Sequence, residues 1–193
     1  MINNNNYIQY IQDAEGNVFN LADAYIYKKL LGEITPNSTS TNICLGTGTV
    51  ANGSKNAIAM SATEEAAVAH DEGSVAIGRG NEAIGKYAFA EGYKTVASGE
   101  GSHSEGKNTL ASNDAAHAEG SETRALGKNS HAEGNLSEAL GDCSHAEGGA
   151  TKAIGNYSHA EGNDTYAKGE YSHAEGNHCL ALGEFSHIEG IST

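Results

Sequence analysis

Seven histidines recur in one sequence context, each followed two residues later by a glutamate. In an extended strand, residues i and i+2 point to the same face, so each imidazole would lie beside a carboxylate. Imidazole nitrogens and carboxylate oxygens are ligands for transition metals, and such a pair can also exchange a proton in acid–base catalysis. The pairs are His103/Glu105, His117/Glu119, His131/Glu133, His145/Glu147, His159/Glu161, His173/Glu175 and His187/Glu189.

The repetition of this pair argues against catalysis. A catalytic site is a single constellation, whereas the His/Glu pair returns at regular intervals. The chain contains no H-E-x-x-H, G-x-S-x-G or phosphate-binding loop pattern, and its Gly-x-Gly spacings fall in turns. We therefore expect no enzyme, no catalytic residue, no metal site and no cofactor. A polar interface in which His and Glu satisfy one another is the favoured interpretation, and a metal or anion site is the alternative.

Composition and charge exclude several classes of protein. The 193 residues include 25 Gly, 1 Pro and no Trp, and only 6% are aromatic, so a large core of Leu, Ile and Phe is excluded. A net charge of −14 repels phosphate backbones and anionic lipids, so neither nucleic acid nor a membrane is an expected partner. No apolar run approaches the ~18 residues of a membrane span. Met1 and the Asn run after it lack the features of a signal peptide. Three cysteines without a CxxC pair fit a reducing compartment.

A repeat of fourteen residues organises the rest of the chain. Glu-Gly pairs begin at positions 91, 105, 119, 133, 147, 161, 175 and 189. A second set of positions, also fourteen residues apart, forms a column that consists of Gly85, Gly99, Asn113, Gly127, Gly141, Gly155, Gly169 and Gly183. Because Asn is the non-Gly residue that best tolerates positive φ, Asn113 predicts a left-handed backbone at the positions of this column.

Two segments of each repeat, T-x-A-x-G and S-H-A-E-G, alternate small residues with others at period two, which is typical of strands. A unit with two short strands cannot bury a face alone, so the units must stack as coils of an all-β solenoid. The Thr, Ser and Ala side chains would point inward, and the His/Glu pairs would point outward. Tyr157, Tyr171 and Phe185 share a column at a turn and are placed to stack along an edge.

The repeat predicts two regions, 1–41 and 42–193. The second holds about ten coils, one of which, from Asn56 to Gly73, is lengthened by four residues. In the first, the sequence predicts a hairpin between Tyr7–Ile11 and Val18–Phe19, then a helix from Asn20 through Leu31. We interpret this small α/β segment as an attachment segment. Its candidate contact residues are Tyr7, Tyr10, Phe19, Leu21, Tyr25 and Leu31.

Ser74 to Gly78 reads S-V-A-I-G and is followed by spaced A-x-G motifs and S-H-A-E-G variants. This pattern resembles the YadA-like head of trimeric autotransporter adhesins and the related repeats of bacteriophage fibres, over roughly residues 42–190. The resemblance implies a left-handed parallel β-roll of 14-residue coils and a homotrimer in which alternating Val and Ile face the partner chains. Carried over, it places Val75, Ile77 and the seven His/Glu pairs in the trimer interface.

Two functions follow from the resemblance. The preferred one is a structural fibre of a bacteriophage virion, assembled in the host cytoplasm, attached through residues 1–41 to capsid or tail/baseplate proteins and meeting a host surface ligand. The stretch from Gln12 to Ala24 resembles segments near the starts of phage structural proteins. The alternative is the head of an adhesin on a bacterial cell surface. Ice binding is disfavoured because the Thr column shares the inward parity of Ala.

In such a trimer, three imidazoles would meet at each level, which is a plausible ring for a metal or an anion. Pairing of His with Glu is the favoured arrangement. If charged imidazolium pairs with Glu, the folded pKa of His is expected to lie above its reference value of ~6.5.

Overall fold

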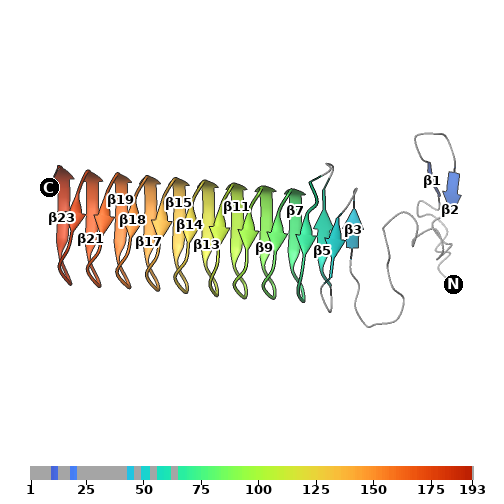
Figure 1. Cartoon of the computed structure of the whole chain (residues 1–193), viewed down its shortest axis with the longest axis horizontal. Coiled ribbons are helices and arrows are strands. Elements are labelled where there is room, and N and C mark those ends of the chain that lie inside the picture. The colour runs from blue at the N-terminus through green and yellow to red at the C-terminus, as the bar shows by residue number, and fades with distance from the viewer. Residues whose placement is uncertain are drawn as a thin grey trace, which may run out of the picture.

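The computed structural model describes residues 10–12, 18–20, 43–45, 49–52, 56–61 and 65–192. Among them are two parallel sheets that run the length of one elongated shaft, with no helix (Figure 1). From β3 onward, strands of an eleven-stranded sheet alternate along the chain with strands of a ten-stranded sheet, so about ten coils stack as a parallel β-solenoid. The expected all-β solenoid of about ten coils is confirmed.

The eleven-stranded sheet, called here the long-strand sheet, has strands of up to five residues. Its members are β3 (Ile43–Leu45), β5 (Ile58–Met60), β7 (Val75–Arg79), β9 (Phe89–Tyr93), β11 (His103–Lys107), β13 (His117–Ser121), β15 (His131–Asn135), β17 (His145–Gly149), β19 (His159–Asn163), β21 (His173–Asn177) and β23 (His187–Ile191).

The ten-stranded sheet, called here the short-strand sheet, has strands of two residues. Its members are β4 (Val50–Ala51), β6 (Val68–Ala69), β8 (Glu82–Ala83), β10 (Val96–Ala97), β12 (Leu110–Ala111), β14 (Arg124–Ala125), β16 (Glu138–Ala139), β18 (Lys152–Ala153), β20 (Tyr166–Ala167) and β22 (Leu180–Ala181).

The strand register follows the fourteen-residue repeat. His103 pairs with His117, and Ala97 pairs with Ala111, so like residues stack directly above one another. The coil before β7 is longer than fourteen residues, as the pairing of Ile58 with Val75 shows. Parallel stacking in register therefore converts each column of the sequence into a ladder along the shaft.

Small side chains fill the interior of the described coils. From β5 onward the alanines of both sheets are 0–1% exposed, and most of the Thr and Ser residues beside them are equally buried, as their parity predicts. The Ser hydroxyls also fix the corners: Ser144 Oγ donates to the Gly141 carbonyl oxygen at 2.6 Å, and Ser172 Oγ donates to that of Gly169 at 2.6 Å. Such a core leaves little apolar area to stabilise a lone chain.

The expectation of a left-handed backbone at Gly85, Asn113 and their column is wrong. None of these residues has positive φ. The glycines of this column are explained by close approach of the coils: a Cβ on Gly127, for example, would lie closer than 3.0 Å to the backbone of Gly141 in the next coil. Positive φ occurs instead at the Gly of the Glu-Gly pair, such as Gly134 with φ 99°. It also occurs at two turn positions per coil that carry ordinary residues, such as Leu136 and Cys143.

Near the N-terminus, β1 (Tyr10–Gln12) and β2 (Val18–Asn20) pair antiparallel, where the sequence predicts a hairpin. Tyr10 and Phe19 lie on these strands. The predicted helix begins at Asn20, which ends β2, and its remaining residues lie outside the described part of the chain. The other candidate attachment residues, Tyr7, Leu21, Tyr25 and Leu31, lie outside it as well.

Candidate functional site

The seven His/Glu pairs form one continuous row on the outward face of the long-strand sheet, here called the His/Glu ladder. Each strand from β11 to β21 buries its second residue and leaves the His and the Glu half-buried, whereas on β23 both are exposed. The predicted sharing of one face is therefore confirmed. In the described chain this face lies outside the small-residue core, and its side chains contact one another from coil to coil.

The imidazole rings stack along the ladder. Ring centroids of consecutive histidines from His103 to His173 are 4.7–4.8 Å apart, with interplanar angles of 1–18°. His187 is tilted by 37° from His173. Stacking fixes the ring planes, so the Nε2 atoms lie in a row beside the carboxylates.

The ladder continues an apolar face that the sequence identified only in part. Val75 and Ile77 are half-buried on β7, in register with Ile58 and Met60 on one side. On the other side Val75 pairs with Phe89, which occupies the His column. Phe89, Ile58 and Met60 were not among the predicted interface residues, although their column positions could have identified them.

Within one chain the His and Glu side chains are close but not hydrogen-bonded. The Nε2 atom lies 3.6–3.9 Å from Oε2 of the same coil's Glu in five coils, beyond hydrogen-bond distance. Six Nε2 atoms are buried and have no hydrogen-bond partner among the described residues. They belong to His103, His117, His131, His145, His159 and His173. The mutual satisfaction that the sequence predicts is thus not made by direct bonds inside the chain.

The acid–base properties of the ladder follow from this packing. Burial lowers the pKa of His117, His145 and His159, and the neighbouring histidines lower it further. The raised pKa expected for charged pairing is not found at these three residues, because desolvation and like-charge repulsion outweigh the attraction of the carboxylates; burial without pairing has this effect. Although the His–Glu distances resemble ion pairs, these imidazoles favour the neutral form.

The glutamates repel one another along their own column. Hydrogen bonding to Glu105 and Glu133 raises the pKa of Glu119 to about 7, and bonding to Glu133, burial and bonding to Glu161 raise that of Glu147 to about 7. The same sharing lowers the pKa of Glu105 and Glu133. From Glu105 to Glu147 the column therefore alternates carboxyls of lowered and raised pKa, an arrangement that stacked carboxylates adopt to reduce repulsion.

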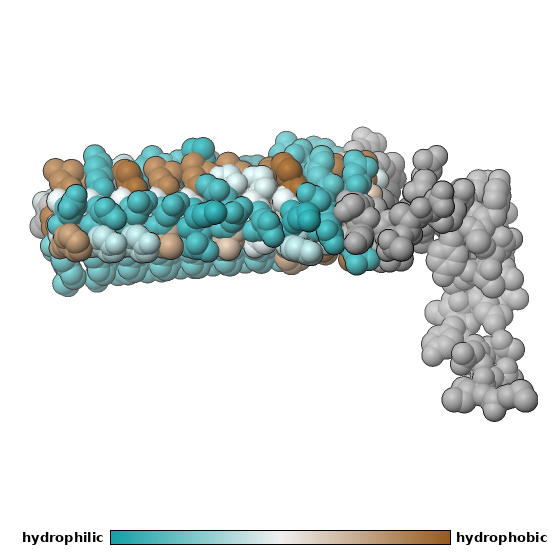
Figure 2. All heavy atoms as spheres, turned by 90° about the horizontal axis from the view of Figure 1, so that it is seen from below, coloured by the Kyte–Doolittle hydropathy of each residue, from teal (hydrophilic) through white to brown (hydrophobic). Residues whose placement is uncertain are grey.

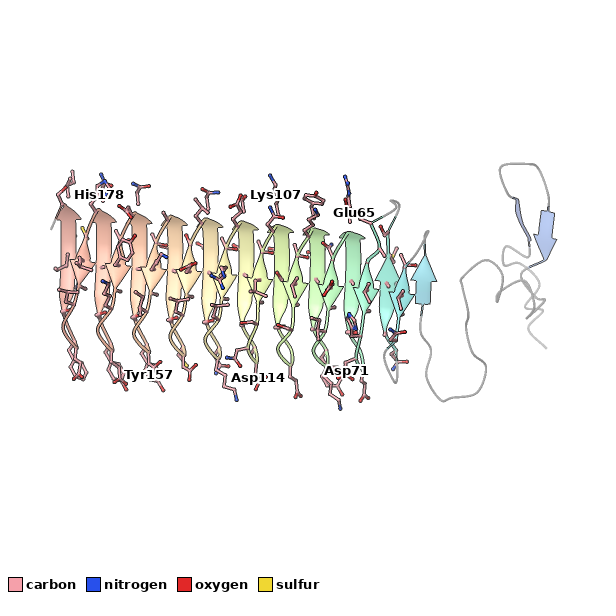
Figure 3. The ribbon with its side chains drawn as sticks, viewed as in Figure 1. Glu65, Asp71, Lys107, Asp114, Tyr157 and His178 are labelled. Carbon is pink, nitrogen blue, oxygen red and sulfur yellow. The ribbon has the colours of Figure 1, made fainter. Side chains whose placement is uncertain are left out.

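Other ladders cover the remaining surfaces. Glu65, Lys107 and His178 lie along one edge of the shaft, and Asp114 and Tyr157 lie along the opposite edge (Figure 3). On that second edge Tyr157, Tyr171 and Phe185 stack with centroids 4.9 and 5.0 Å apart, so the predicted edge stacking is confirmed.

The outward face of the short-strand sheet is more varied. Its residues are exposed or half-buried, and ion pairs join successive coils: Arg124 Nη1 lies 3.2 Å and Lys152 Nζ 2.8 Å from Glu138 carboxylate oxygens. Lys152 lowers the pKa of Glu138 through that bond. The short-strand face therefore lacks the uniformity of the ladder. Figure 2 views the shaft from the edge that carries Asp114 and Tyr157, and there hydrophilic residues predominate, with hydrophobic residues gathered in short rows.

Residues 69–95 match the YadA head domain repeat, in two copies. Residues 69–95 therefore resemble two YadA head repeats. The match spans Val75, Ile77 and Phe89, and so includes the start of the face that continues as the His/Glu ladder. No curated protein matches the chain. The YadA head repeat indicates an adhesin-like fibre domain, in agreement with the solenoid shaft. Among the described residues there is no helix long and apolar enough to cross a membrane.

Proposed function

We propose that the chain is the shaft of a homotrimeric fibre of a bacteriophage virion, with the His/Glu ladder and the apolar residues before it as the trimer interface. The observation that carries this proposal is the ladder itself: an outward face that keeps its residue types coil after coil while its Nε2 atoms lack partners. Buried polar atoms cost free energy unless they are bonded, and neighbouring chains can supply those bonds.

The core supports association. Because Ala, Thr, Ser, Cys and Asn side chains fill the interior of the described coils, hydrophobic burial within one chain is small, and contacts between chains would supply part of the stability. The role is structural rather than enzymatic, because the ladder repeats one arrangement and offers no single constellation. Residues 1–41 attach the shaft to capsid or tail proteins, and the far end meets a host surface ligand.

Sedimentation of the full chain in buffer with a chelator tests the trimer. The expected species at micromolar concentration has three times the 19.9 kDa chain mass. His145→Glu adds charge to the ladder and should shift the equilibrium toward monomer. Val96→Glu, on the short-strand sheet where Glu138 already occupies the same column, should leave the trimer intact. A well-folded monomeric parent chain would overturn the proposal.

A second candidate is the head of a bacterial surface adhesin, which is favoured by the match of residues 69–95 to a repeat of the YadA head domain. The resemblance of Gln12 to Ala24 to phage structural proteins and the exposed free thiol of Cys143 support the virion instead. Mass spectrometry of purified phage particles and of bacterial envelope fractions separates the two. Recovery of the chain only in envelope fractions would decide for the adhesin.

A further inference from the structure

The Nε2 atoms of the ladder are available as ligands. Six of them are buried at the atom and lack a hydrogen-bond partner among the described residues, yet the histidine side chains that carry them are 33–36% exposed. The rings therefore lie partly open on the outward face of the sheet, although Nε2 itself is covered. An unpaired imidazole nitrogen in the neutral state presents either a lone pair or an N–H, according to its tautomer.

The spaces between coils bring together two imidazoles and one carboxylate. In each of three such groups, one ligand atom per residue lies within 4.8 Å of the others. The groups are His117/Glu119/His131, His145/Glu147/His159 and His159/Glu161/His173. A tetrahedral ion with bonds of about 2.0–2.1 Å holds its ligands roughly 3.4 Å apart. The Nε2–Oε2 distances of 3.6–3.7 Å within a coil are close to that spacing. The two imidazoles are stacked with ring centroids 4.7–4.8 Å apart, so their rings must tilt toward each other to share one ion.

We propose that the His/Glu ladder binds a divalent transition metal of the Zn²⁺ class between successive coils, through two imidazole nitrogens and one carboxylate oxygen of a single chain. Imidazole selects Zn²⁺, Ni²⁺ and Cu²⁺ over Mg²⁺ and Ca²⁺, which prefer sites built from oxygen alone. Three protein ligands leave a fourth position, which water or a residue of a neighbouring chain would fill.

Charge and spacing set how many ions the ladder holds. The metal would lie among stacked carboxylates of a chain with a net charge of −14, where a cation reduces the repulsion. His159 belongs to two of the three groups, so these two cannot be filled together, whereas the group around Glu119 shares no residue with them. Two ions per chain follow for these groups.

A Zn²⁺ titration of the full chain, stripped with a chelator and dialysed, tests the inference. Calorimetry should report micromolar binding of at least two Zn²⁺ per chain, Co²⁺ should give the visible absorption of a four-coordinate site, and Zn²⁺ should raise the melting temperature. His159→Val removes the ligand that two groups share and should lower the stoichiometry by about one. Val75 shows that this column accepts Val.

His178→Asn is the matched control, because His178 lies off the ladder and its Nδ1 bonds Asp164 at 2.7 Å. It should leave Zn²⁺ binding unchanged. If His159→Val fails to fold by circular dichroism, Glu119→Gln, which keeps the side-chain shape, should weaken binding at its group at least tenfold. Absence of Zn²⁺ binding at 100 μM (about a hundred times the expected micromolar range), an equal loss in His178→Asn, or displacement of Zn²⁺ by equimolar Ca²⁺ would overturn the inference.

The result is separable from the proposed trimer, because each group comes from one chain. Sedimentation is run with chelator and with Zn²⁺. A chelator-treated trimer that binds no Zn²⁺ would contradict the metal site alone, and a monomer that binds Zn²⁺ would contradict the trimer alone.

Discussion

The ring of Phe89 stacks on the imidazole of His103, with centroids 5.0 Å apart and planes inclined by 8°. This contact joins the apolar start of the long-strand sheet to the His/Glu ladder. The same column is Val at β7, Phe at β9 and His from β11 onward in the long-strand sheet, so one face accepts both apolar and polar side chains. Replacing the polar residues of one coil by the apolar residues of another is therefore a test available within the chain.

The double variant His145→Val, Glu147→Ile should fold, with a melting temperature within a few degrees of the parent. It places the Val75 and Ile77 solution in the middle of the ladder, where the neighbouring side chains are half-buried. Added apolar area offsets the loss of ring stacking. Thermal unfolding followed by circular dichroism measures the effect, and loss of the β-sheet signal at room temperature would show that the ladder is required for folding.

Replacing either of two buried threonines by valine should change the stability of the fold in different directions. Thr165 Oγ1 donates to the Glu161 carbonyl oxygen at 3.0 Å, whereas Thr151 Oγ1 is buried without a hydrogen-bond partner among the described residues. Thr165→Val should cost about 1 kcal/mol, and Thr151→Val should be neutral or stabilising because it removes an unsatisfied hydroxyl. Urea unfolding of both variants decides the matter; equal costs would contradict the assignment.

Because the coils approach closely, adding a methyl group between them should lower the stability of the fold. Gly127→Ala should destabilise the fold by about 2 kcal/mol or more, since its Cβ would lie closer than 3.0 Å to the Gly141 backbone. Gly101→Ala is the control: no atom lies within 4 Å of the added Cβ, and Ala115 occupies the same turn position with φ 52°. Its cost should not exceed about 1 kcal/mol. Urea unfolding of both variants measures the two costs. Comparable costs would show that coil spacing is not the constraint.

The raised pKa of Glu147 predicts a pH-dependent stability in the metal-free protein. Because its folded pKa of about 7 exceeds the ordinary 4.5, its contribution is fully present below about pH 4.5 and is lost as pH rises through 7. Glu147→Gln cannot ionise, so at pH 8 it should melt above the parent by a few degrees, roughly 1 kcal/mol after solvent screening. The difference should shrink toward pH 5.

The control for this measurement is Glu82→Gln, an exposed residue of β8 on the other sheet. Its pH profile should follow that of the parent. A Glu147→Gln profile that runs parallel to the parent's from pH 5 to 8 would exclude the shared proton.

Lowered pKa values predict the titration of the histidines. Imidazole resonances of His117, His145 and His159 should titrate below pH 6.5 in the metal-free protein. Their contribution to stability is then present above the unfolded pKa and lost as pH falls through the folded one. Nuclear magnetic resonance resolves this directly, and midpoints above 6.5 would restore the charged pairing that the sequence suggested.

The sequence by itself determined the register, the inward parity of Thr and Ala, and the common face of the His/Glu pairs. The reason is geometric: in a parallel stack, residue i lies above residue i+14, so spacing alone places His103 beside His117. The sequence also identified Val75 and Ile77 as part of that face.

Only the tertiary structure decided how tightly the coils approach and what each polar atom meets. A Cβ on Gly127 is excluded by the backbone of the next coil, and the Nε2 of His145 lies 3.7 Å from Glu147 rather than bonded to it. These distances, and the pKa shifts that follow from them, depend on how the coils close in three dimensions. Spacing along the chain determines which residues are neighbours, but burial and separation determine whether neighbouring groups bond, repel or remain unpaired.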